Sequence, residues 1–458
     1  MLNGASSPIS SLGTLIRHPI FLIAVAGIAI RLFIFPFVEV GYDSDFWATI
    51  IGNIKAGEGL YGLEGYYYTP VWGYILSFVS FMQESFLHID VMGIRVPEVF
   101  LVESFTDWFF SATATSVSFN ISVKIPFLIS DLIVGYLVYW LIKDKTADMR
   151  KATIGFALWF LCPLVIFVTS VSGMFDTFSV LFALLCVIMI RKDKLFLGGV
   201  LFSFAVLTKF FPLFLIFILI AYIIVRHRDD GKALKSVLTA AAGSILAFLV
   251  LMAPQIIEGN LTESLLFVTT RATSDGGMIS GALAAYLVGI VAAVVLAYSL
   301  SKKNREELDD SLFKYILLMV TILFMYPPTP QYLVLLIPFL AIYIATADLR
   351  LKWSWLLISV GGACFIAGGN LTLFLSLGTF TDIISLDYIM SAIEWFQTPV
   401  LMGAAPMFLI YNISGVVQYA GILSIIGLFI WDAYIRSRKS NTPFNPLRSF
   451  SSYRQPRE

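Results

Sequence analysis

The chain is poor in charged residues. Only 13% of its 458 residues are Asp, Glu, Lys or Arg, whereas 59% are hydrophobic and the mean hydropathy is +0.87. No soluble globular class has this composition, so the sequence predicts a polytopic membrane protein. The 30 basic and 30 acidic residues cancel, and this lack of net charge argues against nucleic acid as a partner.

Cysteine is also scarce, and the three cysteines form no pattern. Cys162, Cys186 and Cys364 all lie in apolar runs. Their spacing fits neither a metal site nor a disulfide framework, so they are interpreted as packing residues. The sequence also lacks an internal repeat. No small-residue cleavage site follows the first apolar run, which is therefore expected to remain as an anchor.

Long apolar runs make up most of the chain. About 20 apolar residues span a bilayer, and scanning for such runs predicts about twelve transmembrane helices. They are expected near residues 19–38, 123–142, 152–171, 177–190, 195–208, 210–225, 236–254, 280–300, 311–326, 332–347, 353–376 and 411–433. The predicted fold class is an all-α polytopic membrane protein. Residues 1–18 form a cytoplasmic N-terminus, 19–433 a single transmembrane domain, and 434–458 a disordered cytoplasmic tail.

Lysine and arginine set the expected orientation, because cytoplasmic loops are enriched in them. With the N-terminus inside, most basic residues fall in the short inner connections and in the tail. The two long connections, 39–122 and 377–411, then face the external or lumenal side, where any chemistry is expected. Segment 71–83 is apolar but too short to span, which predicts a helix lying in the interface.

An acidic triplet, Asp43-Ser44-Asp45, directly follows the first apolar run in EVGYDSDFWATIIGNIKAGEGLYGLEGYYYTP, residues 39–70. Two carboxylates at this spacing can bind a divalent cation such as Mg²⁺ or Mn²⁺, or one can act as a general base oriented by the other. The triplet alone fits a solvated loop start better than a site. The triplet lies beside the membrane, where a carboxylate without a partner is energetically unfavourable, and this position favours a binding or catalytic site.

A second acid and a base are predicted to lie at similar depth in the membrane. Asp176 precedes the inner residue Arg191 by 15 positions, and Lys209 follows Lys194 by 15. At about 1.5 Å per residue, each is about 22 Å from the inner boundary. Asp176 and Lys209 should therefore face each other, either as a buried ion pair or as part of a cavity whose cation meets a phosphate. Gly173 would let the backbone approach a ligand closely.

Weaker candidates lie elsewhere in the chain. Asp131, in the second apolar run, is either a core aspartate bonded to a neighbouring helix or a ligand-binding residue. Arg271 lies in an outer loop and is either a phosphate clamp or a solvated residue. Gln331 and Tyr332 follow a proline-rich turn, which needs no function, yet they would point donors at the same outer cavity.

The tyrosines of the first long connection have two interpretations. Tyr67 and Tyr68 belong to the run YYYTP, and tyrosines are common in the interfacial belts of membrane proteins. Sugar rings also stack on tyrosine faces, so both residues are candidates for substrate binding if the site takes carbohydrate.

These motifs together resemble a known family. Asp43-Ser44-Asp45, GLY at 59–61 and YYYTP at 66–70 are similar to the first outer loop of polyprenyl- and dolichyl-phosphate-mannose-dependent mannosyltransferases of the GT-C superfamily. That group includes the catalytic subunit of GPI mannosyltransferase I and related prokaryotic and archaeal membrane enzymes. KIPFLISDL, LCPLVIFVTSVSGMFDT, LTKFFP and PTPQYLVLLIP resemble later family segments, in order, over residues 39–339. The chain departs at Cys162-Pro163, where the family has Asn-Pro, and at Gly173-Met174, where it has Gly-Gln.

The resemblance implies a GT-C glycosyltransferase fold and an inverting transfer. A hexose, mannose above all, would move from a polyprenyl or dolichyl phosphate to a lipid-linked or protein acceptor. Asp43 or Asp45 would take the acceptor proton, and Lys209, with Arg271, would neutralise the departing phosphate. The connection 39–122 would be catalytic and 377–411 acceptor-side. The resemblance also implies a small accessory membrane subunit, contact with membrane lipid, and a plasma-membrane or endoplasmic-reticulum location with an external or lumenal active site.

Two other functions fit part of the pattern. A transporter or flippase would use Asp131, Asp176 and Lys209 along a path, but it predicts inverted repeats that the sequence lacks. An inactive relative that scaffolds other glycosylation enzymes would tolerate loss of Asp43 and Asp45, which this chain keeps.

Overall fold

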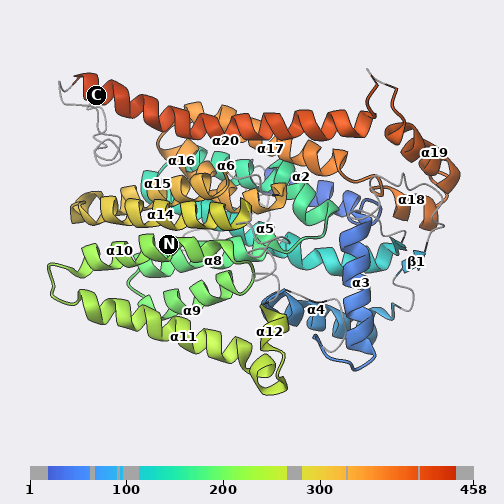
Figure 1. The fold of residues 1–458 in the computed structure, drawn as a ribbon, viewed down its shortest axis with the longest axis horizontal. Helices are drawn as coiled ribbons and strands as arrows, with labels where there is room; N and C mark the ends of the chain where they lie inside the picture. The colour runs from blue at the N-terminus through green and yellow to red at the C-terminus, as the bar shows by residue number, and fades with distance from the viewer. Residues whose placement is uncertain are drawn as a thin grey trace, which may run out of the picture.

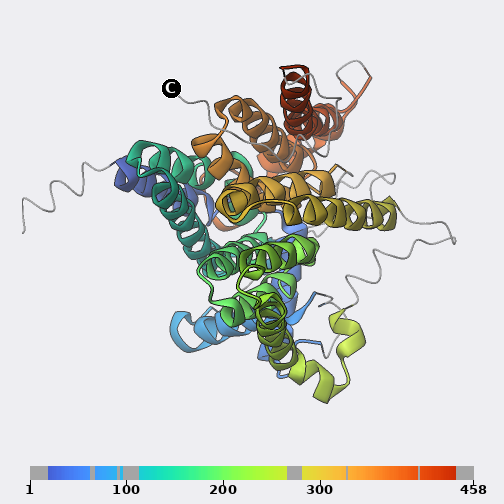
Figure 2. The ribbon, with the colours of Figure 1, turned by 90° about the vertical axis from the view of Figure 1, so that its left-hand side faces the viewer.

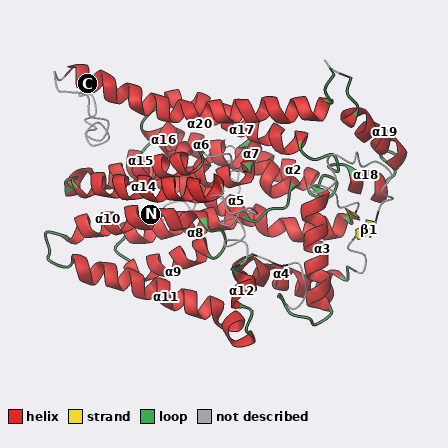
Figure 3. Ribbon diagram, viewed as in Figure 1, coloured by secondary structure: helices red, strands yellow, loops and turns green. Residues whose placement is uncertain are grey.

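A computed structural model describes residues 19–61, 66, 68–89, 93–95, 113–265, 281–325, 329–400 and 403–439. Two site candidates, Tyr67 and Arg271, lie outside these residues, as do the N-terminal segment and most of the predicted tail. The described part is almost entirely helical (Figures 1 and 3). Its strands are β1 (Gly93–Arg95) and β2 (Thr113–Thr115), which pair antiparallel. The coarse fold class, an all-α membrane protein, is confirmed.

Helices occupy all twelve predicted apolar runs, and two short helices, at Leu261–Ser264 and Leu349–Leu351, lie between runs. Along the chain they are α2 (Pro19–Ile34), α5 (Val117–Thr146), α6 (Met149–Phe160), α7 (Pro163–Ile166), η3 (Phe167–Val171), α8 (Asp176–Arg191), α9 (Leu195–Val206), η4 (Phe211–Leu215), α10 (Ile216–His227), α11 (Ala233–Glu258), α12 (Leu261–Ser264), α14 (Gly281–Ser301), α15 (Arg305–Leu323), η5 (Pro330–Leu335), α16 (Leu336–Thr346), η6 (Leu349–Leu351), α17 (Lys352–Gly368) and α20 (Pro406–Lys439).

Four of the described helices are each long and apolar enough to cross a membrane: α5, α11, the stretch Leu349–Gly368, and Pro406–Ile435 within α20. The bent pair Met149–Phe160 and Pro163–Val171 makes a fifth if it counts as one span. Figure 2 places α11 and α20 on opposite sides of the molecule, with the other long helices between them.

The predicted run 152–171 is broken rather than continuous. Its two parts are bent by 43°. The break falls at Leu161-Cys162, just before Pro163, which begins the next helix. Proline has no backbone N–H and clashes with the preceding turn, so a bend at this point follows from the sequence.

The two long connections are largely helical. The first contains α3 (Gly41–Lys55), α4 (Pro70–Met82) and η1 (Gln83–Leu87), and the second contains α18 (Leu375–Phe380) and α19 (Leu386–Gln397). The short helix predicted at 71–83 is therefore present as α4. Figure 1 shows α3 running across the direction of the long helices. At the other end of the chain, α20 continues to Lys439, into the segment predicted as a disordered tail.

A buried carboxylate, Glu39, joins the first long connection to the residues just before the second. It is 0% exposed. Its oxygens accept hydrogen bonds from the backbone and hydroxyl of Thr115, from Asn120 and from Ser376. The Glu39 N–H donates to the Leu373 carbonyl at 2.9 Å. We call this group the Glu39 latch, because it ties the segment that leads into α3 to the segment around α18.

Candidate functional site

The Lys209 ammonium lies in a buried aromatic box. Its Nζ atom is 4.2 Å from the ring centre of Phe175, 4.9 Å from that of Tyr68 and 5.3 Å from that of Tyr332. Aromatic faces attract a cation, and the attraction strengthens when water is excluded. Lys209 is only 4% exposed. The box therefore stabilises a positive charge and holds it at a fixed position.

Asp176 shares this box. Its Oδ2 atom is 3.6 Å from Lys209 Nζ, and both side chains are almost fully buried. The sequence prediction that these two residues face each other is confirmed. Asp176 begins α8, and Lys209 lies between α9 and η4, so two short connections at the same end of neighbouring helices bring the charges together. Their role in binding a phosphate stays a prediction.

Asp43 is the acid of the triplet that lies within reach of this pair. It sits in the first turn of α3 and is partly exposed. Burial raises the pKa of the Asp43 carboxyl from 3.8 to about 7. Lys209 opposes the rise, and the negative charge of Asp176 adds to it. A carboxyl with a pKa near 7 can both accept and release a proton at neutral pH.

A tryptophan fixes α3 against this region. Trp47 lies one helical turn after Asp43, so both side chains emerge on the same face of α3. The Trp47 Nε1–H donates to the Gly173 carbonyl at 3.0 Å. Gly173 has a φ of +64°, a left-handed conformation that glycine adopts without steric cost. The hydrogen bond therefore connects the acid-bearing helix to the turn that leads into Asp176.

The tyrosine-rich segment closes the box from another side. Tyr68 contributes its ring, and its carbonyl accepts a hydrogen bond from the Tyr61 hydroxyl at 2.6 Å. The Thr69 hydroxyl donates to the Leu207 carbonyl at 2.6 Å, two residues before Lys209. The segment thus packs as part of the site, and Tyr68 lies with the buried charges and not in an exposed belt.

Asp45 is separated from Asp43 by the helix itself. Residues two apart in an α-helix do not face each other. Both acids lie in α3, whereas the sequence placed them in a loop. Binding of one cation by both carboxylates would require the first turn of α3 to open. Among the described residues, no group of three or more His, Cys, Asp or Glu side chains could hold a metal ion.

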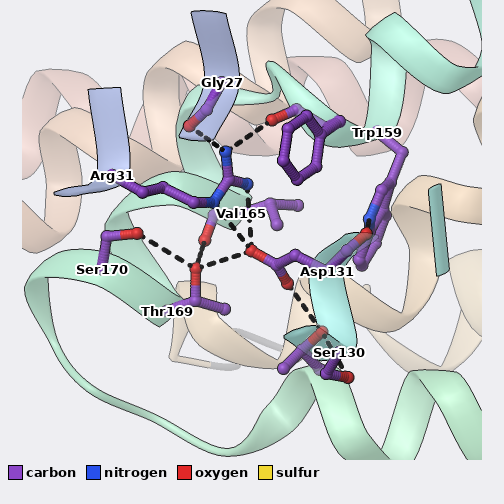
Figure 4. Close-up of polar contacts among 10 residues, drawn as sticks. Gly27, Arg31, Ser130, Asp131, Trp159, Val165, Thr169 and Ser170 are labelled. Atoms are coloured by element: carbon purple, nitrogen blue, oxygen red, sulfur yellow. Dashed lines mark hydrogen bonds and ion pairs between the residues drawn. The ribbon is translucent and has the colours of Figure 1, made fainter. Parts of the chain in front are cut away.

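Asp131 lies in a different, fully buried polar cluster (Figure 4). Its Oδ2 atom is 2.9 Å from an Arg31 guanidinium nitrogen and accepts a hydrogen bond from Thr169, while Oδ1 accepts one from Thr177 at 2.8 Å. Arg31 also donates to the Phe160 carbonyl at 2.8 Å. Asp131 and Arg31 are both 0% exposed. This geometry favours the core interpretation of Asp131 over ligand binding.

The other predicted site residues are placed as follows. Tyr332 belongs to the aromatic box and is 3% exposed, whereas the neighbouring Gln331 is half-buried in η5. Tyr67 and Arg271 lie outside the described residues. The structure therefore gathers Asp43, Asp176, Lys209 and two tyrosines.

Sequence reasoning missed several residues of the site. Trp47 and Phe175 were not candidates, because a single aromatic residue in an apolar chain carries no signal. Outside the site, the buried Lys124 was also missed; it is 1% exposed and donates to the Phe35 and Val38 carbonyls at 3.2 and 2.7 Å. Its position inside a predicted span, seven residues before Asp131, was the available signal.

No protein-family model matches the chain, and no curated protein matches it in sequence. The case for a function therefore depends on the geometry of the site and on the motifs within the chain.

Proposed function

We propose that this chain is an integral membrane glycosyltransferase of the GT-C type, with about twelve membrane-crossing helices. It moves a hexose, with mannose as the first candidate, from a polyprenyl-phosphate donor to a lipid-linked or protein acceptor on the external or lumenal face. The observation that carries the proposal is that Asp43 interacts electrostatically with the buried Asp176–Lys209 pair, whose ammonium lies in an aromatic box.

Asp43 is the general base in this proposal. It removes the proton from the acceptor hydroxyl while that oxygen attacks the anomeric carbon of the donor. The bond from the anomeric carbon to the phosphate oxygen breaks on the opposite face, so the configuration inverts. A base works best when its pKa lies near the working pH, and the Asp43 pKa of about 7 meets this condition.

Lys209 receives the departing phosphate. A buried cation that is already in position stabilises negative charge that develops on a leaving group, without reorganisation of solvent. Asp176 keeps the ammonium charged and oriented until the phosphate takes over as its partner. Tyr68 and Tyr332, whose rings line the same box, offer faces for the sugar.

The test uses membranes that contain the protein and radiolabelled polyprenyl-phosphate mannose. Asp43→Asn should lower transfer of label by roughly 100-fold or more, as expected when a general base is lost. Asp45→Asn is the matched control, because it makes the same change two residues away on another face of α3. Equal loss in both variants would contradict the assignment of Asp43 as the base.

Label that is never transferred by wild-type membranes, but crosses the bilayer on its carrier, would overturn the transferase proposal. That result would favour the flippase interpretation, in which the buried charges line a path. Transfer that survives in Asp43→Asn at the wild-type rate would remove Asp43 from the mechanism.

A further inference from the structure

An apolar cavity lies away from the charged site, between the ends of α17 and α20 and the helices α18 and α19. Its volume is about 440 Å³, within the roughly 300–1,000 Å³ typical of small-molecule pockets. Of the residues that line it, none is charged, and only Asn370 and Tyr388 have polar side chains. The Asn370 amide is already engaged, because it donates to the Ile366 carbonyl at 2.6 Å. The cavity can therefore recognise little beyond hydrocarbon.

The rim of the cavity is exposed and apolar. Phe374 is 47% exposed and Ile410 is 38% exposed, and both line the cavity. Ile410 belongs to α20, one of the helices long and apolar enough to cross a membrane. The cavity thus opens on an exposed apolar surface that includes a residue of a candidate membrane-spanning helix.

We infer that this cavity holds one acyl chain of a bilayer phospholipid. An apolar cavity without an occupant forfeits the van der Waals contacts of its lining atoms, and a neighbouring lipid chain can supply them. Because no charged side chain lines the cavity, the cavity itself recognises hydrocarbon and not a charged group. Abundance then decides the occupant, and phospholipid chains are the most abundant hydrocarbon beside the protein.

The occupant would support the segment that leads into α3. Leu373, which lines the cavity, accepts the hydrogen bond from Glu39 N–H. The adjacent Thr372 hydroxyl accepts one from Gly41 N–H at 2.9 Å, two residues before Asp43. Filling the cavity therefore stiffens the backbone to which the start of α3 is bonded. This inference does not depend on the transfer reaction.

The test uses the full-length protein in vesicles of phosphatidylcholine with a diazirine on one acyl chain. After irradiation and digestion, mass spectrometry maps the labelled residues. We expect label to be enriched in peptides from residues 367–396. Ala392→Phe, which places a ring among the residues that line the cavity, should reduce that label roughly tenfold, equivalent to about 1.4 kcal/mol of lost binding. Ser391→Phe is the matched control, because Ser391 is exposed on the same helix and does not line the cavity.

Three results would overturn the inference. One is an even spread of label over the apolar surfaces of α11 and α20, with no enrichment at residues 367–396. Wild-type protein alone is enough to reveal this result. Another is an equal decrease in Ala392→Phe and Ser391→Phe. The third is displacement of the label by a polyprenyl phosphate, which would make the site one for an isoprenoid carrier. Because the decisive map comes from wild-type protein, a folding defect in Ala392→Phe leaves the inference falsifiable.

Discussion

Replacement of Trp47 by Phe should loosen the turn that carries Gly173 and Asp176. The substitution keeps an aromatic ring in the core but removes the N–H that donates to the Gly173 carbonyl at 3.0 Å. Trp72 provides a matched control. It is 0% exposed, and its ring lies 5.6 Å from that of Trp47. Among the described residues, its indole N–H has no acceptor.

The difference in stability between the two variants can be estimated from these contacts. Both substitutions remove part of a buried indole, and Trp47 and Trp72 are 1% and 0% exposed. Both rings also contact Phe175, with ring centres 5.8 and 5.3 Å away, so each variant loses packing against the measured segment. Only Trp47→Phe leaves a buried carbonyl without its donor, which costs about 1–3 kcal/mol. Trp47→Phe should thus be the more destabilising change by about that amount.

Amide hydrogen exchange followed by mass spectrometry measures this locally, in detergent or in nanodiscs, and needs no substrate. Peptides that cover residues 167–176 should exchange roughly 5- to 100-fold faster in Trp47→Phe than in Trp72→Phe. This ratio corresponds to a free energy of local opening that is lower by about 1–3 kcal/mol. Equal exchange in the two variants, or faster exchange in Trp72→Phe, would refute the reasoning that the hydrogen bond holds the turn.

Three further predictions concern Asp43, Asp131 and Glu39. Between about pH 4 and 7 Asp43 keeps a proton in the folded protein that the unfolded chain has already lost, so wild-type stability should fall as pH rises across that window. Asp43→Asn should have a higher free energy of unfolding than wild type at pH 8, by up to roughly 4 kcal/mol, and the difference should close toward pH 4; a difference independent of pH would contradict this. Arg31→Met and Asp131→Leu should each lower the free energy of unfolding by about 3–5 kcal/mol, and the double variant should lower it by less than the sum of the two. Thermal unfolding in detergent measures this, and additive losses would contradict a coupled pair. Glu39→Gln should speed hydrogen exchange in residues 372–376, because charge-assisted hydrogen bonds worth about 1.5–3 kcal/mol are weakened, whereas unchanged exchange would show that the Glu39 latch does not hold that segment.

Much of the helical framework could be predicted from apolar runs alone. The run 353–376 shows where that approach fails. The helix α17 ends at Gly368, because the following residues turn to bond with the first long connection, through Leu373 and Thr372. A partner more than 300 residues away in the sequence leaves no local signal. The end of a helix set by such a contact cannot be predicted from hydropathy.

The candidate site was predictable only in part. Equal spacing from the inner boundary placed Asp176 and Lys209 at one depth, and they are indeed paired. The approach of Asp43 to that pair could not be derived, because it depends on how α3 crosses the bundle. The helical state of the triplet was not predicted either, and it turns Asp43 and Asp45 to different sides of α3.

The Glu39 latch imposes an order on the biogenesis of the protein. Glu39 and its partner Ser376 are 337 residues apart. At a synthesis rate of about 5–20 residues per second, Ser376 is made roughly 20–70 seconds after Glu39. Throughout that interval the carboxylate lacks one of its donors, and the start of α3 lacks the backbone partners supplied by Thr372 and Leu373. The site near Asp43 therefore takes its final form late, so a ribosome that stalls before residue 372 leaves a chain with most of its helices but an unfinished site.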